Sequence, residues 1–151
     1  MREQADLWNR ELGEKGVTLY ILRYCNRGAL VYVCRKSRLK KELSKPEIQR
    51  FLMGYGYRCN EIESVIARLK ERLRAEESFP HEIGIFLGYP LEDVKGFIEN
   101  AGKNAKCTGC WKVYNNECEA IRTFRQYKTC RDVYARLWMQ GISVRQLTVA
   151  V

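Results

Sequence analysis

Three cysteines in the second half of the chain lie close enough in sequence to suggest a metal or redox site. Cys107 and Cys110 form a C-x-x-C motif, and Cys118 follows shortly after it. A structural zinc site closes a tetrahedron of four ligands and usually draws them from two such motifs. A redox C-x-x-C motif normally opens a helix, whereas this one precedes the strand-like residues 110–114. We therefore predict ordinary buried thiols and no metal, with Cys107, Cys110 and Cys118 as the alternative ligand set.

His81 and Glu82 form the second candidate, because His81 is the only histidine of the chain. A neutral imidazole beside a carboxylate can act as a general base. A nucleophile–base pair would also need a cysteine nearby in space, and the sequence does not indicate which one. A lone histidine before an apolar segment is more often a hydrogen-bonded structural residue. We predict no catalytic residue, and a cysteine- or histidine-dependent enzyme is the alternative.

The turn formed by Gly88, Tyr89 and Pro90 is a stronger candidate for ligand binding. A helix that starts at such a turn presents free N–H groups to an anion, and Gly88 lets a backbone approach closely. The sequence has no glycine-rich phosphate fingerprint and no P-loop, so we predict no cofactor. A purely structural role for the turn fits equally well. The candidate ligand-binding residues are His81, Glu82, Gly88, Tyr89, Lys112, Tyr114, Tyr127 and Lys128.

The charge balance favours an acidic partner. The chain has 27 Lys and Arg residues against 18 Asp and Glu residues, a net charge of +9. Such a surplus steers encounters with acidic proteins, nucleic acids or anionic ligands. Aromatic and basic residues alternate in the segments WKVYNN (111–116) and RTFRQYKTCR (122–131). This pattern is also typical of surfaces that bind nucleic acid. No nucleic-acid-binding motif supports this alternative, and a helix with a solvated basic face explains the same residues.

Composition and the chain start indicate the compartment. No run of 18 apolar residues is present, so we expect no membrane span. The first 16 residues, MREQADLWNRELGEKG, are polar and lack the apolar core of a signal peptide. The seven cysteines are an odd number, which favours reduced thiols over a disulfide framework. We expect a cytoplasmic protein.

The pattern of apolar residues predicts an α+β fold in a single domain, residues 1–151. Residues 17–24 and 29–35 read as two strands of a hairpin joined by Asn26 and Gly28. Further strands are predicted in the apolar run after His81 and at 110–114 and 142–151. Helices are predicted at 3–12, after Pro46 with a Ser44–Glu47 capping box, from Asn60, after Pro90, and from about Glu117 to Gln140. We expect a mixed sheet of about five strands with helices packed on it.

The helix from Asn60 is predicted to bury Ile62, Ile66, Leu69 and Leu73. Glu92 and Asp93 in the first turn after Pro90 complement the helix dipole. The long last helix is predicted to turn inward the residues Ile121, Phe124, Tyr127, Tyr134, Leu137 and Trp138.

Several segments together resemble a bacterial family of proteins with a domain of unknown function. They are ALVYVCR (29–35), FPHEIGIFLGYPLEDVKGFI (79–98), GCWKVY (109–114) and YKTCRDVY (127–134). The resemblance covers nearly the whole chain and implies no established activity. The resemblance implies an additional N-terminal region before the first strand in members of that family, and we expect this chain to be without it. They often have an aromatic residue at the position of Cys110, which weighs further against a metal site.

The resemblance also implies a partner. Genes of this family often lie near genes for flavodoxin-like proteins, which are acidic. A domain with a net charge of +9 would be drawn to such a protein, and salt would weaken the encounter. We predict a cytoplasmic, non-catalytic binding or accessory domain that engages an acidic flavodoxin-like protein or a small anionic ligand. A nucleic-acid-binding protein is the alternative partner class.

Overall fold

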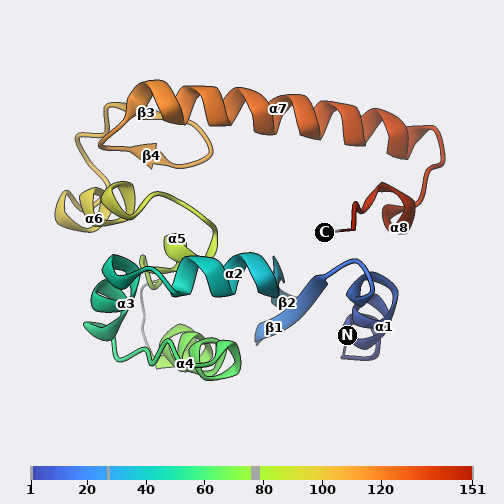
Figure 1. Ribbon diagram of the computed structural model, residues 1–151, viewed down its shortest axis with the longest axis horizontal. Helices are drawn as coiled ribbons and strands as arrows, with labels where there is room; N and C mark the ends of the chain where they lie inside the picture. Colours follow the sequence, from blue (N-terminus) through green and yellow to red (C-terminus); the bar gives the residue numbers. More distant parts are fainter. Residues whose placement is uncertain (1, 27, 76–78, 151) are drawn as a thin grey trace. The chain divides into compact units, whose positions relative to one another are not determined.

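The structure is a computed structural model that describes residues 2–26, 28–75 and 79–150 (Figure 1). Its elements follow one another in the order α1 (Arg2–Gly13), β1 (Val17–Cys25), β2 (Gly28–Arg35), α2 (Lys36–Leu43), α3 (Pro46–Met53), α4 (Ile62–Ala75), α5 (Ile83–Phe86), α6 (Leu91–Glu99), β3 (Cys107–Thr108), β4 (Lys112–Val113), α7 (Glu117–Met139) and α8 (Val144–Leu147).

The prediction of one mixed sheet of about five strands is wrong. Within the described residues the strands form two separate two-stranded antiparallel sheets, β1–β2 and β3–β4. The apolar run after His81 forms the short helix α5 instead of a strand. Short apolar runs fit a buried strand and a buried helix equally well, so periodicity alone did not separate the two.

The predicted closing strand at 142–151 is also absent from its described residues, 142–150. Here Ser143 and Gln146 form a capping box that starts α8. The Ser143 N–H donates to Gln146 Oε1 at 3.0 Å, and the Gln146 N–H donates to Ser143 Oγ at 3.3 Å. This reciprocal pair is a helix-start signal, and it outweighs the alternation of apolar residues.

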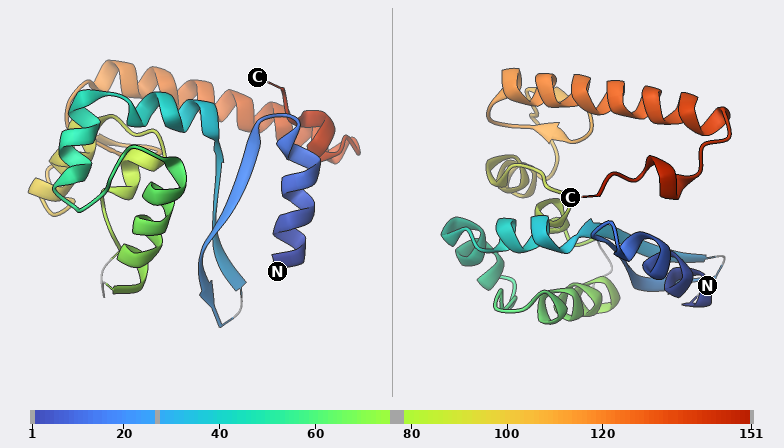
Figure 2. Two further views of the ribbon diagram at one scale, coloured as in Figure 1. Left: turned by 60° about the horizontal axis from the view of Figure 1, so that its bottom comes forward. Right: turned by 45° about the vertical axis from the view of Figure 1, so that its right-hand side comes forward.

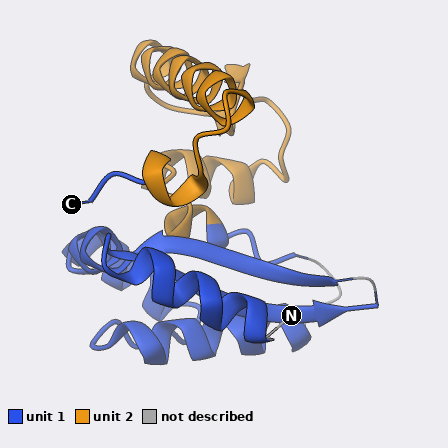
Figure 3. Ribbon diagram, turned by 90° about the vertical axis from the view of Figure 1, so that its right-hand side faces the viewer, with its two compact units in different colours: residues 1–83, 148–151 blue, residues 84–147 orange. Residues whose placement is uncertain are grey.

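The chain divides into two compact units (Figure 3). Unit 1 contains residues 1–83 and 148–151, and unit 2 contains residues 84–147. Each unit is described by itself below, and the single-domain organisation stays a prediction.

The predicted hairpin of unit 1 is confirmed. Residues of β1 and β2 pair from Val17 with Arg35 to Cys25 with Gly28, and a bulge interrupts the register between Ile21 and Arg23; residue 27 of the turn lies outside the described residues. Helices α1 and α4 both contact β1 and flank the hairpin (Figure 2, left). The core of unit 1 is made by side chains of these two helices, of α2 and α3, and of both strands. The buried side chains include Leu12, Leu22, Tyr32, Leu39, Leu43, Ile48, Leu52, Val65, Ile66, Leu69 and Leu73.

A buried ion pair ties α4 to the chain before α5. Glu82 is 1% exposed and accepts hydrogen bonds from Arg72 Nε at 2.8 Å and from the Tyr57 hydroxyl at 3.0 Å. A carboxylate without such partners would be costly to bury. Burial, with the Glu82 charge as a smaller cause, raises the pKa of Tyr57 far above its ordinary value, so Tyr57 stays a neutral donor.

A second buried carboxylate organises unit 2. Asp93, in the first turn of α6, is 3% exposed. Its Oδ2 accepts from Trp111 Nε1 at 2.7 Å, and its Oδ1 accepts from the backbone N–H groups of Tyr114 and Asn115 at 2.8 and 3.0 Å. These donors flank β4, so one side chain holds the β3–β4 hairpin to α6.

Two glycines leave room for aromatic rings to pack closely within unit 2. A Cβ at Gly96 of α6 would lie 2.5 Å from the side chain of Tyr114, and a Cβ at Gly109 would overlap the ring of Phe124. No side chain larger than glycine fits at either position without a shift. Gly109 therefore has a packing role inside the C-x-x-C motif.

We expect Asp93→Ala to destabilise unit 2 by about 3 kcal/mol, because it leaves the buried Trp111 N–H and two backbone donors without an acceptor. The adjacent Glu92→Ala is the matched control, since Glu92 is exposed and only pairs with Lys95 at the surface; we expect it to cost under about 1 kcal/mol. Urea unfolding followed by circular dichroism compares the two. Equal stabilities of the two variants would contradict the role given to Asp93.

Candidate functional site

The site is built on α7, the longest helix, with 23 residues from Glu117 to Met139. Asn116 caps it, because its Oδ1 accepts from the Glu119 N–H at 3.2 Å. Glu117 and Glu119 in the first turn complement the positive end of the helix dipole. The predicted helix from about Glu117 to Gln140 is thus confirmed.

The N-terminal third of α7 is anchored in unit 2. Ala120 is buried in a cluster with Trp111 and Val113, and Phe124 packs on the same cluster. The Phe124 ring meets Trp111 edge to face, with centroids 4.6 Å apart, and Tyr89 stacks on Trp111 at 5.0 Å. Because Asp93 fixes the Trp111 indole, the start of α7 has a rigid support.

Beyond Phe124 the apolar stripe of α7 continues without a cover. Tyr127, Tyr134 and Trp138 are 50%, 41% and 57% exposed. They continue the spacing of three, four and seven residues that Ala120 and Phe124 begin, which is the spacing of one helix face. The prediction that these three aromatic side chains face inward is wrong. Single exposed apolar residues are common, but aligned large ones mark an interaction surface.

The same part of α7 is strongly basic. Its basic residues are all exposed and comprise Arg122, Arg125, Lys128, Arg131 and Arg136. Lys128 pairs with Asp132 at 2.6 Å, and this hydrogen bond lowers the pKa of the Asp132 carboxyl. Within the described part of the chain, Arg125 and Arg136 have no acidic partner. Their charges are thus available to an acidic surface.

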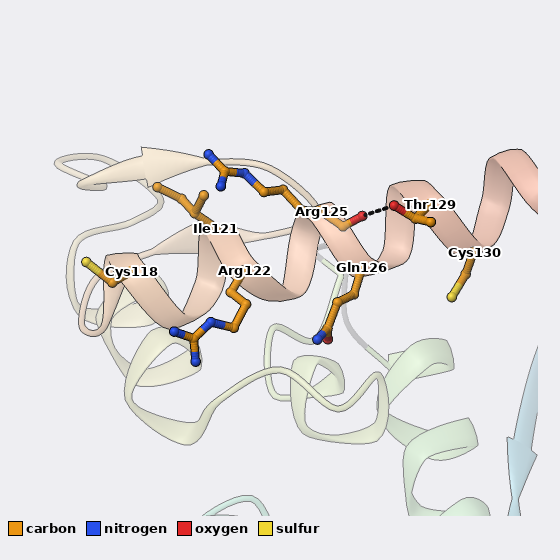
Figure 4. Close-up of a pocket in the computed structure, with 7 residues that line it drawn as sticks. All are labelled: Cys118, Ile121, Arg122, Arg125, Gln126, Thr129 and Cys130. Carbon is orange, nitrogen blue, oxygen red and sulfur yellow. Dashed lines mark hydrogen bonds between the residues drawn. The ribbon is translucent and has the colours of Figure 1, made fainter.

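A shallow groove of about 520 Å³ lies along this helix (Figure 4). It is lined only by α7 residues: Cys118, Ile121, Arg122, Arg125, Gln126, Thr129 and Cys130. Arg122 and Gln126 project from one side of the helix, and Ile121 and Arg125 project from the other (Figure 4). The groove therefore belongs to the exposed helix surface, and it offers arginines on both sides. We refer to the exposed residues of α7 from Arg122 to Trp138 as the α7 surface.

Two of the predicted site residues belong to unit 1. His81 is exposed, whereas Glu82 is buried in its pair with Arg72. The structure therefore gives Glu82 a structural partner. The other six candidates belong to unit 2, and the common pocket for all of them stays a prediction.

Four of the unit 2 candidates have structural contacts. Gly88 has a φ of +78°, which favours glycine, and the Tyr89 hydroxyl donates to the Cys110 carbonyl at 3.2 Å. Lys112 Nζ donates to the Gly102 carbonyl at 2.6 Å. Tyr114 packs on α6, and its hydroxyl is buried without a hydrogen-bond partner among the described residues. Tyr127 and Lys128, by contrast, lie on the α7 surface.

The prediction of buried thiols is wrong for most cysteines. Cys25, Cys110, Cys118 and Cys130 are exposed. The other three are partly buried, and burial raises the pKa of the thiols of Cys34, Cys59 and Cys107. Among the described residues no three His, Cys, Asp or Glu side chains lie close enough together to hold a metal ion.

The fold and the α7 surface define a basic α+β protein of two units with one long, partly uncovered helix. The chain belongs to the family described as "Protein of unknown function (DUF3793)", whose model matches residues 1–148. This confirms the expected membership of a domain-of-unknown-function family. No curated protein and no solved structure matches the chain significantly. None of the helices in residues 2–26, 28–75 and 79–150 has the length and hydrophobicity that crossing a membrane requires.

We expect brief alkylation at pH 8 to label Cys118 and Cys130 at least several-fold faster than Cys34 and Cys59. The first two thiols lie exposed on α7, while burial keeps the other two less accessible and raises their pKa, so fewer of them are thiolates. Mass spectrometry of peptides gives the individual rates, with exposed Cys110 as the reference. Labelling of Cys130 as slow as that of Cys34 would contradict the exposed α7 surface.

Proposed function

We propose that this chain is a cytoplasmic, non-catalytic binding domain that engages an acidic protein through the α7 surface. The observation that carries the proposal is the exposed aromatic face of α7, made by Tyr127, Tyr134 and Trp138. Helical spacing places exposed Arg131 on the same face, with exposed Lys128 next to it. An acidic flavodoxin-like protein is the first partner to test, on the basis of its charge and of the family resemblance.

The aromatic face supplies the energy that such an interface needs. Trp, Tyr and Arg are the residues that most often dominate binding energy. The rings of Trp and Tyr bury large areas and lose little side-chain entropy. Tyr127, Tyr134 and Trp138 recur at i, i+7 and i+11, which is the pattern of a helix that lies in a groove of its partner. Stacking on single-stranded bases has no such helical requirement, so this spacing favours a protein over nucleic acid.

The charges of the α7 surface orient an acidic partner and raise the rate of association. Five exposed basic residues and only one acidic residue, Asp132, occur between Arg122 and Arg136. A surface of this kind accelerates encounters with an acidic protein and disfavours basic ones. Since the α7 surface is exposed to solvent, added salt screens the attraction.

The anchor at the start of α7 makes the surface suitable for docking. Phe124 is held on Trp111, and Trp111 is held by Asp93. The helix therefore keeps its conformation before the partner arrives, and less entropy is lost on binding.

We expect the double variant Lys128→Glu, Arg131→Glu to bind the flavodoxin-like protein at least about tenfold more weakly, because it places two acidic groups beside the aromatic face and against an acidic surface. Isothermal titration calorimetry at several salt concentrations measures this, and the unaltered chain should lose affinity as salt increases. The control is Lys40→Glu, Lys41→Glu, which makes the same change in net charge on the exposed side of α2.

Two results would count against the proposal. Equal weakening by the two double variants would show that only total charge matters, and absence of binding at low salt would remove this partner. Nucleic acid that co-purifies with the unaltered chain and not with the Lys128→Glu, Arg131→Glu variant would favour the nucleic-acid alternative.

A further inference from the structure

A second groove lies in unit 1, between α1 and α4. Its volume is about 320 Å³, and its lining comprises Ala5, Asp6 and Asn9 of α1, Leu19 to Leu22 and Tyr24 of β1, and Lys70 and Arg74 of α4. Successive residues of a strand point to opposite faces. Because four consecutive residues of β1 line the groove, the groove follows the edge of the strand and not one face of the sheet.

At one position of this edge, a side chain already forms the two hydrogen bonds that an added strand would form. The Leu19 N–H donates to Asn9 Oδ1 at 2.8 Å, and Asn9 Nδ2 donates to the Leu19 carbonyl at 3.1 Å. A residue of a neighbouring antiparallel strand makes the same two bonds. The amide of Asn9 therefore shows that the backbone groups of Leu19 point away from β2 and into the groove.

The next outward position is open. Backbone groups on one edge of an antiparallel pair alternate along the strand, so the N–H and carbonyl of Ile21 face the same way as those of Leu19. No described backbone group from outside the hairpin forms a hydrogen bond with them. The bulge that follows between Ile21 and Arg23 increases the local twist and ends the regular edge.

The α4 wall supplies charges at a spacing that fits a strand. Lys70 and Arg74 line the groove one turn apart on α4, which corresponds to about 6 Å along the helix axis. Alternate side chains of an extended peptide are about 6.7 Å apart on one face. Two acidic residues separated by one position therefore match the two cations, while Asp6 on the α1 wall disfavours further acidic groups on the opposite face.

We infer that this groove binds an extended peptide segment with an acidic-x-acidic pattern, which adds to the edge of β1 as a third strand. The peptide backbone pairs with Ile21, and its acidic side chains face Lys70 and Arg74. Strand addition draws its affinity from backbone bonds and its specificity from the alternate side chains. The site does not involve α7, so it is independent of the proposed docking surface.

A capped heptapeptide in which aspartates alternate with valines is a suitable probe for the full-length chain. We expect this peptide to slow amide hydrogen exchange at Ile21 by about tenfold or more at saturation, as read by NMR. The same peptide N-methylated at alternate residues is the control, because it keeps the side chains and loses the strand donors. We expect the control to leave the exchange at Ile21 unchanged.

Substitutions of the basic residues test whether Lys70 and Arg74 bind the acidic side chains of the peptide. Lys70→Ala, Arg74→Ala should weaken binding of the peptide at least about tenfold, whereas Lys40→Ala, Lys41→Ala on α2 should have little effect. The Lys128→Glu, Arg131→Glu variant should bind the peptide normally, so failure of the α7 proposal is distinguishable from failure of this one.

Three outcomes of the peptide experiments would overturn the inference. They are equal binding of the N-methylated peptide, binding without protection of Ile21, and no binding of the peptide at millimolar concentration. Protection of Ile21 by inorganic phosphate alone would instead assign the groove to a small anion, and that result would overturn the strand-addition site as well.

Discussion

Three donors from the region around β4 converge on the carboxylate of Asp93, and the organisation of unit 2 depends on this convergence. The two oxygens accept the Trp111 indole N–H and the backbone N–H groups of Tyr114 and Asn115. These bonds fix the Trp111 indole on α6. The Phe124 ring packs on this indole, so the start of α7 has a rigid support. A carboxylate that is 3% exposed is tolerable only because it has these partners.

The anchored start of α7 explains why the rest of the helix can remain uncovered. Isolated helices are marginal in water, and packing of one face normally supplies their stability. Here Ala120 and Phe124 supply that packing at one end, and Asn116 caps it. Beyond them the helix presents Tyr134 and Trp138 to solvent. Large aligned aromatic side chains on a solvent-facing helix are costly unless a partner covers them, which is why we assign binding to this surface.

Local patterns predicted the longer helices well, missed the short helices α5 and α8, and predicted the tertiary roles poorly. The spacing of Ile66, Leu69 and Leu73 correctly placed α4 and its buried face, because this signal is local. The role of Asp93 depends on Trp111, 18 residues away, so its position in a first turn indicated only a dipole effect. The apolar stripe of α7 predicted burial for Tyr127 and Trp138, because the same spacing marks a core and an interface. Of the predicted site residues, only Tyr127 and Lys128 lie on the α7 surface.

Backbone hydrogen–deuterium exchange along α7, with and without an acidic flavodoxin-like protein at low salt, tests the central claim most directly. The account predicts that amides between residues 127 and 138 exchange more slowly in the complex, while those around Asp93 and Trp111 are already protected in the free chain. Protection that appears elsewhere while α7 stays unchanged would contradict it.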